Sequence, residues 1–246
     1  MTYMARIKAT VLDALETVNE AEYIALRIAG ANNSRYWDSQ PPEEAEIFAR
    51  FKREVKSYYR GAQGLKCCYC SFELRDDHST FDAEHILDKS THNNFMFDLN
   101  NLAVACKCCN RAKNTKNPLV DNNANLAAVP SEPNAYRILH PHLDEWSLHL
   151  EFDEVNRIRP VRGSQKGAAT IDVCDIHVLN AARLASHFRR HSRSAEMMLR
   201  SFFRYKRRSK KIECLNLLRA LADEHNLAPA QAIVGRLENE FERGEA

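Results

Sequence analysis

The sequence predicts an α+β fold that is mainly α-helical, with a small β-containing core between two helical regions. Three observations support this prediction. Apolar residues recur at helical spacing near both ends of the 246-residue chain. Two pairs of cysteines spaced i, i+3 bracket a β-like run over 79–86. A second alternating run, 146–152, predicts one strand of a β-hairpin.

Shifts in composition divide the chain into four expected regions. They are a helical region over 1–62, a cysteine-rich core over 63–120, a loop and β-hairpin over 121–170, and a helical region over 171–246. The net charge is only +2, so overall charge says little about nucleic-acid binding. No apolar run is long enough to span a bilayer, so we expect no membrane association.

The first region predicts two helices. Residues 3–30 form the first, whose core-facing positions are Ile7, Val11, Leu15, Val18, Tyr23 and Leu26. Residues 31–42 are polar and contain two prolines, which is typical of a linker. The run Pro41-Pro42-Glu43-Glu44 opens the second helix, since helix starts favour proline and acidic residues, and this helix ends near Gly61.

Four of the eight cysteines predict a structural zinc site. The N-terminus has no apolar signal-peptide core, so we expect a cytoplasmic chain whose cysteines stay reduced. In that compartment Cys-x-x-Cys pairs favour zinc over a disulfide. The knuckle spacing selects as zinc ligands Cys67, Cys70, Cys106 and Cys109.

The other cysteines are not expected to bind the metal. Cys68 and Cys108 lie inside the two pairs, and we interpret them as bystanders. Cys174 and Cys214 lie in apolar, helical surroundings and are interpreted as core residues.

A second set of donors lies between and just after the cysteine pairs. Glu84 and His85 end the β-like run, and Asn110 directly follows the last cysteine. Oxygen and imidazole donors suit a second, catalytic divalent ion such as Mg²⁺. Lys113 follows Asn110 by about one helical turn and is placed to reach a phosphate. The alternative is that these are ordinary surface or capping residues.

Residues 67–116 resemble an HNH (ββα-metal, His-Me finger) endonuclease module of the type with a four-cysteine zinc knuckle. The matching residues are Cys67 to Cys70, Glu84-His85-Ile86, Asn101-Leu102 and Cys106 to Cys109-Asn110-Arg-Ala-Lys113. The last histidine of the family pattern is replaced by Asn110, and the acidic residue is Glu84 where aspartate is commoner.

This resemblance implies hydrolysis of a phosphodiester bond with a single catalytic ion. His85 would act as general base on a water molecule. One Mg²⁺ or Mn²⁺ ion, held by Glu84 and Asn110, would stabilise the phosphate and the leaving oxygen. Asn101 would fix the loop that orients His85, Lys113 would assist at the phosphate, and the zinc would serve structure alone.

The C-terminal part predicts a hairpin followed by helices. Residues 146–152 and 157–161 are the expected strands, and the helices are expected near 175–190, 193–207, 209–225 and 228–243. From Arg183 to Lys211 there are 11 Lys/Arg and one acidic residue, Glu196. Such a run favours contact with phosphates, and a docking surface for a partner protein is the alternative.

Residues 140–190 carry a weaker resemblance to the PtuB group, HNH proteins found with the Septu and retron anti-phage systems. Its residues are His140-Pro-His-Leu-Asp144, His149-Leu, Ile158-Arg-Pro160, Lys166-Gly167, Thr170-Ile171 and Leu179-Asn180. The resemblance implies a nuclease effector of anti-phage defence. Its implied partners are nucleic acid, an ABC-type (PtuA-like) ATPase and retron components.

Three classes of function therefore remain open on the sequence. The leading hypothesis is a metal-dependent HNH endonuclease acting on DNA. A nuclease of the same chemistry acting on RNA or tRNA is the second. The third is a catalytically silent zinc-knuckle module that binds nucleic acid or protein, in which Glu84, His85 and Asn110 are surface residues.

Overall fold

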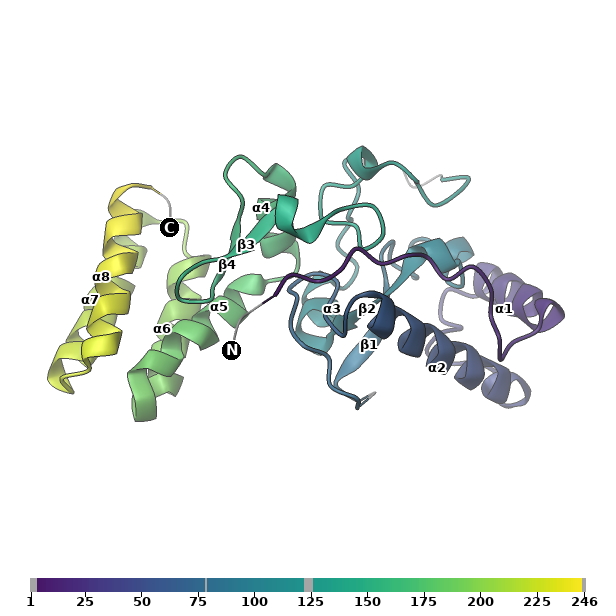
Figure 1. Cartoon of the computed structure of the whole chain (residues 1–246), viewed down its shortest axis with the longest axis horizontal. Helices are drawn as coiled ribbons and strands as arrows, with labels where there is room; N and C mark the ends of the chain where they lie inside the picture. Colours follow the sequence, from purple (N-terminus) through teal and green to yellow (C-terminus); the bar gives the residue numbers. More distant parts are fainter. Residues whose placement is uncertain (1–3, 78, 122–125, 245–246) are drawn as a thin grey trace. The chain divides into compact units, whose positions relative to one another are not determined.

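The computed structural model describes residues 4–77, 79–121 and 126–244 (Figure 1). Within these ranges the protein is an α+β fold that is mainly helical and contains two separate two-stranded sheets, which confirms the predicted fold class. The chain divides into two compact units. Unit 1 consists of Met1–Glu151 with Pro160–Asp175, and unit 2 consists of Phe152–Arg159 with Ile176–Ala246. The finer division into four regions stays a prediction.

The N-terminal segment differs from the single helix expected over 3–30. Helix α1 spans only Glu20–Asn32, and the described residues before it follow an irregular, largely extended course. A capping box starts the helix: the Asn19 side chain accepts a hydrogen bond from the Glu22 amide, and the Glu22 carboxylate accepts one from the Asn19 amide. The helix therefore begins at this box.

A buried arginine explains why the preceding segment stays extended. The Arg6 side chain is 3% exposed and donates hydrogen bonds to the carbonyl oxygens of Cys68, His140, Pro141 and Asp144. Burial lowers the pKa of this guanidinium. Because a buried guanidinium needs acceptors for its donors, these contacts outweigh the helical periodicity of the segment.

The expected linker over 31–42 is a folded turn that brings two aromatic side chains into the core. Tyr36 is 2% exposed and Trp37 is 8% exposed. A short 3-10 helix, η1 (Pro42–Glu44), leads into α2 (Ala45–Ala62), close to the expected start and end of the second helix. The buried residues of α2 lie at helical spacing along one face: Phe48, Phe51, Val55 and Tyr59.

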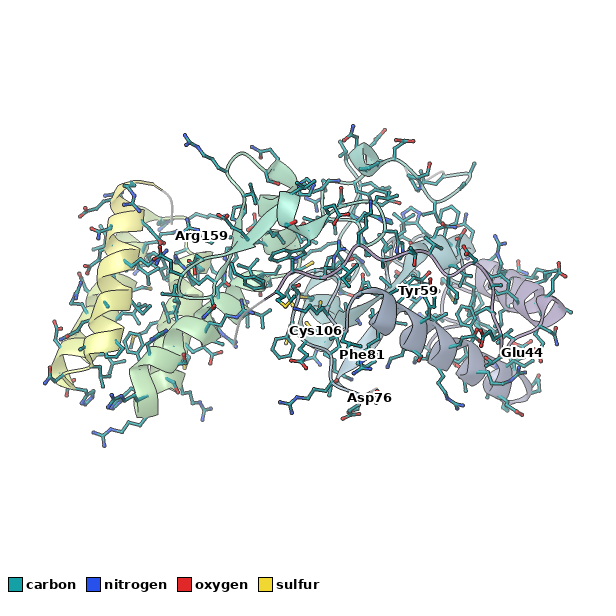
Figure 2. The ribbon with its side chains drawn as sticks, viewed as in Figure 1. Glu44, Tyr59, Asp76, Phe81, Cys106 and Arg159 are labelled. Atoms are coloured by element: carbon teal, nitrogen blue, oxygen red, sulfur yellow. The ribbon has the colours of Figure 1, made fainter. Side chains whose placement is uncertain are left out.

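The centre of unit 1 is a β-β-α arrangement. Strand β1 (Phe81–His85) pairs antiparallel with β2 (Leu102–Cys106). Phe81 faces Cys106 at one end of the pair, and Figure 2 labels both residues. His85 faces Leu102 at the other end. Helix α3 (Lys107–Lys113) follows β2 without a loop and contacts both strands. The strand expected within 79–86 is therefore present.

Two connections in unit 1 contain short 3-10 helices. The 3-10 helices η2 (Asn93–Phe95) and η3 (Leu99–Asn101) occupy the connection from β1 to β2. The loop that follows α3 contains η4 (Pro133–Ala135), and residues 122–125 lie outside the described ones.

The hairpin is shorter than the sequence predicts. Residues 146–148 form a 3-10 helix, η5 (Trp146–Leu148), and only Leu150–Phe152 forms strand β3, which pairs with β4 (Ile158–Pro160). The Trp146 indole nitrogen donates a hydrogen bond to the carbonyl oxygen of Tyr69, and the indole is 2% exposed. This buried anchor accounts for the turn where alternation predicted a strand.

Helix α4 (Gln165–Val173) was not expected, and the residues of the weaker resemblance explain its position. Lys166 forms an ion pair with Asp144, and the Thr170 hydroxyl accepts a hydrogen bond from the Leu139 amide. A Cβ atom at Gly167 would lie 2.0 Å from the carbonyl oxygen of His149, so only glycine fits there. These motif residues therefore hold unit 1 together.

Unit 2 is built from helices that match the expected ranges to within a few residues. They are α5 (Ile176–Ala185), η6 (Ser186–His191), α6 (Ser192–Arg204), α7 (Arg208–Glu224) and α8 (Ala228–Glu242). Helices α7 and α8 pack side by side (Figure 1). The unit has its own apolar core, which includes Leu184, Phe188, Leu199, Phe202, Leu218 and Leu237.

Among the described residues, none of the helices is both long and apolar enough to cross a membrane.

Candidate metal centre and adjoining cavity

Four thiols meet at one end of the β1-β2 sheet. One sulfur atom from each of these residues lies within 4.8 Å of the others, and all four side chains are buried: Cys67, Cys70, Cys106 and Cys109. The Cys70 and Cys106 sulfur atoms are 3.7 Å apart. Four clustered thiols suit the tetrahedral coordination of zinc, so the cluster can bind a metal ion of that kind. These are the four cysteines that the spacing selects as candidate ligands.

Local backbone geometry brings the two cysteine pairs together. Cys67 and Ser71 form a tight turn in which the Ser71 amide donates to the Cys67 carbonyl and Ser71 has φ of 57°. Cys106 ends β2 and caps α3, since its sulfur accepts a hydrogen bond from the Cys109 amide. The Cys68 amide donates to the carbonyl of Val104 and ties the turn to β2.

The cluster favours the charged form of one thiol. Burial raises the pKa of the Cys67 thiol, but hydrogen bonds from the thiols of Cys106 and Cys109, among others, hold that pKa well below its usual range. The thiolate is the form that binds a metal ion. Hydrogen bonding with Cys106 raises the pKa of the Cys70 and Cys109 thiols well above the usual range.

The remaining cysteines lie outside this cluster. Cys108 is exposed, and Cys68 is buried, where burial raises the pKa of its thiol. Cys174 and Cys214 are 1% and 6% exposed. Their burial agrees with the interpretation of both as core residues.

A cavity of about 340 Å³ lies beside β1 and α3. Its lining is polar and combines cations, carboxylates, amides and one imidazole: Trp37, Asp38, Lys52, Asp82, Ala83, His85, Asp88, Lys89, Asn110, Arg111, Lys113 and Asn114. Three of the five predicted catalytic residues are among them, namely His85, Asn110 and Lys113. Glu84 and Asn101 do not line the cavity.

His85 is held in a defined orientation. Its Nε2 lies 3.0 Å from the carbonyl oxygen of Met96. A carbonyl can only accept, so Nε2 carries the proton and Nδ1 is the basic nitrogen. Nδ1 has no hydrogen-bond partner among the described residues. Trp37 packs edge-on against the imidazole, with ring centroids 4.4 Å apart. Burial and the nearby Lys89 lower the pKa of His85 to about 3, so the ring is neutral at physiological pH.

Asn101 binds the loop that follows His85. Its side-chain oxygen accepts a hydrogen bond from the Leu87 amide at 2.7 Å, and its amide nitrogen donates to the carbonyls of Leu87 and Phe95. Phe95 directly precedes Met96, whose carbonyl holds His85. These contacts tie the loop that follows His85 to the segment that holds its imidazole, and the positioning role of Asn101 stays a prediction.

Glu84 and Lys113 form a buried ion pair. Their side chains are 1% and 2% exposed, and the Lys113 ammonium lies 2.7 Å from the Glu84 carboxylate. Lys113 also donates to the carbonyl of His85, and the Tyr69 hydroxyl donates to Glu84. Burial raises the pKa of Glu84, which Lys113 opposes. The sequence predicts Lys113 as a contact for phosphate, whereas here its ammonium turns inward from α3 to β1.

The carboxylate in contact with Asn110 belongs to Asp82. The Asn110 amide nitrogen donates to Asp82 at 3.2 Å, and the Lys107 ammonium lies 3.9 Å from the other carboxylate oxygen. The sequence analysis assigned no role to Asp82. Its position two residues before Glu84, on the same face of β1, could have marked it as a candidate, but the spacing does not identify its partner.

Trp37 is another cavity residue to which the sequence assigned no role. It lay in the segment interpreted as a linker, where the adjacent aromatic pair Tyr36-Trp37 was the available signal for burial. The Lys52 ammonium lies 5.7 Å from the Trp37 ring centroid. Trp37 therefore connects the turn after α1 to the wall of the cavity.

The basic run from Arg183 to Lys211 belongs to unit 2 and is partly engaged within it. Arg200 pairs with Glu196, and Lys210 pairs with Glu213 at 2.7 Å. Other cations of this run are exposed, among them Arg189, Arg190, Arg193, Lys206 and Arg207. Contact of this run with phosphates stays a prediction.

Comparison with known proteins yields two related sequences, while no protein-family model matches the chain. The chain is 28% identical over 155 residues to the Septu protein PtuB of Bacillus mycoides (strain KBAB4), which covers 57% of this chain and 51% of that protein. It is 35% identical over 116 residues to the Septu protein PtuB of Bacillus thuringiensis, which covers 47% of this chain and 38% of that protein. The chain thus spans about half or less of the length of these relatives.

Proposed function

We propose that this protein is a metal-dependent endonuclease of the HNH type that hydrolyses phosphodiester bonds in DNA. The observation that carries the proposal is the setting of His85. Its Nε2 is tied to a backbone carbonyl, its Nδ1 is unpaired among the described residues, and its side chain lines a polar cavity shared with Asn110. A neutral imidazole fixed in this tautomer can accept a proton from a water molecule.

The donors at the cavity fit a hard divalent cation. Carboxylate and amide oxygens are the ligands that Mg²⁺ and Mn²⁺ prefer, and Asn110 offers such an oxygen in the cavity wall. Such an ion, held by Asn110 and Glu84, would supply charge stabilisation of the phosphate and of the leaving oxygen. His85 accepts the proton of the attacking water, and Asn101 keeps the loop behind His85 in place. The zinc knuckle supports this geometry.

Glu84 requires an exchange of partners before it can serve as a ligand. Its carboxylate is occupied by the single positive charge of Lys113. A divalent cation attracts the same carboxylate more strongly than one ammonium does at equal distance. Release from Glu84 would free Lys113 for the phosphate contact that the sequence predicts.

The test is cleavage by purified protein with one histidine removed. Plasmid DNA, single-stranded DNA and tRNA are each incubated with Mg²⁺ or Mn²⁺, with zinc content and thermal unfolding measured in parallel. His85→Ala should lower cleavage 10²–10⁴-fold, the usual cost of losing a general base, with zinc content unchanged. His92→Ala is the matched control, because His92 lies in the loop that follows His85 and does not line the cavity. Parental rates in His85→Ala would refute the mechanism.

The same assay separates the two alternative functions. Cleavage of tRNA without cleavage of DNA would assign the chain to RNA, since the metal chemistry does not distinguish the two sugars. Binding of nucleic acid without cleavage of any substrate would indicate a silent zinc-knuckle module.

We further propose that the protein acts in anti-phage defence, on the basis of its similarity to Septu protein PtuB. In that role we expect a partner, an ABC-type ATPase, with retron components in systems that contain them, and a location in the cytoplasm. Purification of the tagged protein from its native operon should recover this ATPase in a stable complex. Recovery of the protein alone would contradict the proposed partnership.

A further inference from the structure

Asp82 and Asn110 come from different elements but meet at the cavity wall. Asp82 lies on β1 opposite Ala105 of β2, and Asn110 lies in α3, which begins immediately after β2. The hydrogen bond from the Asn110 amide nitrogen to Asp82 spans 28 residues of sequence. The fold of β1, β2 and α3 therefore creates this contact directly.

The contact selects one of the two orientations of the Asn110 side chain. An asparagine amide has an oxygen that can bind a cation and a nitrogen that can only donate. A carboxylate can only accept when ionised, so it attracts the nitrogen end and repels the oxygen end. With the nitrogen on Asp82, the Asn110 oxygen is left for a different partner.

Each carboxylate oxygen of Asp82 has a different neighbour on α3. One accepts from Asn110, and the Lys107 ammonium lies 3.9 Å from the other. The Asp82 side chain is 38% exposed, and the Lys107 side chain is 50% exposed. Asp82 is therefore oriented by neighbours on α3 and is accessible beside the cavity, unlike the buried Glu84.

We propose that Asp82 is a positioning residue that orients the Asn110 amide so that its oxygen is presented to the catalytic divalent ion. This inference rests on the proposed function, in which Asn110 holds that ion. Partners that orient metal ligands in this way contribute 10–100-fold to metal affinity in proteins. Asp82 acts through Asn110 and need not touch the ion or the substrate.

The test measures Mn²⁺ binding by electron paramagnetic resonance on the full-length, zinc-loaded protein, in addition to cleavage. Asp82→Ala should weaken Mn²⁺ binding about 10–100-fold. Asp82→Asn should lose less Mn²⁺ affinity than Asp82→Ala, because its side-chain oxygen can still accept from Asn110, but it should not match the parent protein, because its own amide nitrogen can also pair with the Asn110 oxygen. If Asp82→Asn loses as much Mn²⁺ affinity as Asp82→Ala, then the negative charge of Asp82 matters and its hydrogen bond with Asn110 does not. That result would overturn the proposal.

A second background separates positioning from a direct or structural role. Asn110→Asp replaces the amide by a carboxylate, whose two oxygens can both bind a cation in either orientation. In this background Asp82→Ala should leave Mn²⁺ affinity unchanged or raise it, since Asp82 would then face a like charge. An equal loss of affinity in both backgrounds would mean that Asp82 is itself a ligand or supports the fold, and would overturn the proposal.

Failure of the positioning role is distinguishable from failure of the proposed function. Asn110→Ala should abolish binding of Mn²⁺ at the cavity. If Asn110→Ala binds Mn²⁺ like the parent protein, the proposed metal site is wrong and the role of Asp82 falls with it. If Asn110→Ala loses binding while Asp82→Ala does not, the metal site stands and only the positioning role is overturned.

Discussion

The ion pair between Glu84 and Lys113 is buried beside the cavity, so removing one partner is costly. Both side chains are almost fully buried, and the carboxylate and ammonium are 2.7 Å apart. Removing two charges from water carries a desolvation penalty that their attraction offsets only while both are present. The pair also links α3 to the strand that carries His85, because Lys113 donates to the carbonyl of His85.

Replacing one member of this pair should therefore destabilise the metal-free fold. Lys113→Met leaves the Glu84 carboxylate buried without its cation, and we expect the free energy of unfolding to fall by about 3–5 kcal/mol. Urea denaturation of the zinc-loaded protein without Mg²⁺ measures this change. Adding Glu84→Gln to Lys113→Met should recover a large part of the loss, since no buried charge then remains. The control Lys107→Met removes an exposed ammonium and should change stability by less than about 0.5 kcal/mol.

At the scale of elements, the sequence predicts those helices whose start and stop signals are complete. The four C-terminal helices agree within a few residues because apolar periodicity and the Asn226-Leu-Ala-Pro229 break act together. The N-terminal segment is mistaken for helix because Val11 and Leu15 fit a helical stripe, while the distant acceptors of Arg6 are invisible in sequence. The Asn19 and Glu22 capping box was the local signal for the true start.

In the candidate site too, features with a local sequence signal could be predicted, and features set by contacts between distant residues could not. The cysteine spacing and the Glu84-His85 pair are local patterns, so the sequence places both on the correct elements. The partners of these side chains could not be predicted, because they depend on how α3 packs against β1. The pairs Asp82–Asn110 and Glu84–Lys113 arise from that packing and have no signature in spacing alone.

The knuckle joins the turn at Cys67 to the junction of β2 with α3, so its ligands should behave differently from neighbouring cysteines. Cys109→Ser should release the zinc and destabilise unit 1, because structural zinc binding is coupled to folding. Cys108→Ser is the matched control, since Cys108 is adjacent in sequence and exposed. Elemental analysis of both variants gives the result. Zinc retained by Cys109→Ser, or lost from Cys108→Ser, would show that the ligands are misassigned.

At the scale of the whole molecule, each unit contains its own charged or metal-binding centre. Unit 2 contains a buried carboxylate, Glu240, that accepts two hydrogen bonds from Arg157, at 2.9 and 2.6 Å. Arg159 and Arg236 also pair with Glu240. Burial raises the pKa of Glu240, and the three arginines lower it. The arginines have the larger combined effect, so the pKa lies below its usual 4.5.

Acid should therefore weaken unit 2 through Glu240. A carboxyl group with a lowered pKa in the folded state stabilises the fold above its unfolded pKa and loses this contribution as pH falls through the folded value. Urea denaturation between pH 7 and pH 3 should show stability falling below about pH 4.5. Glu240→Gln should be less stable at pH 7 and show a smaller fall on acidification. The exposed Glu242→Gln should match the parent protein, and a parental acid response in Glu240→Gln would exclude this source.

Unit 1 contains both tryptophans of the chain, Trp37 and Trp146, so tryptophan fluorescence reports on unit 1 without signal from unit 2. The Trp146 indole donates to the carbonyl of Tyr69, which lies inside the first cysteine pair. Removing zinc with a tight chelator should therefore lower the thermal midpoint followed by fluorescence and shift the emission to longer wavelength, while helical circular dichroism from unit 2 persists. Zinc should restore the midpoint, and Cys109→Ser should show the lowered value without chelator. An unchanged fluorescence midpoint would mean that the four thiols do not stabilise unit 1 through a metal.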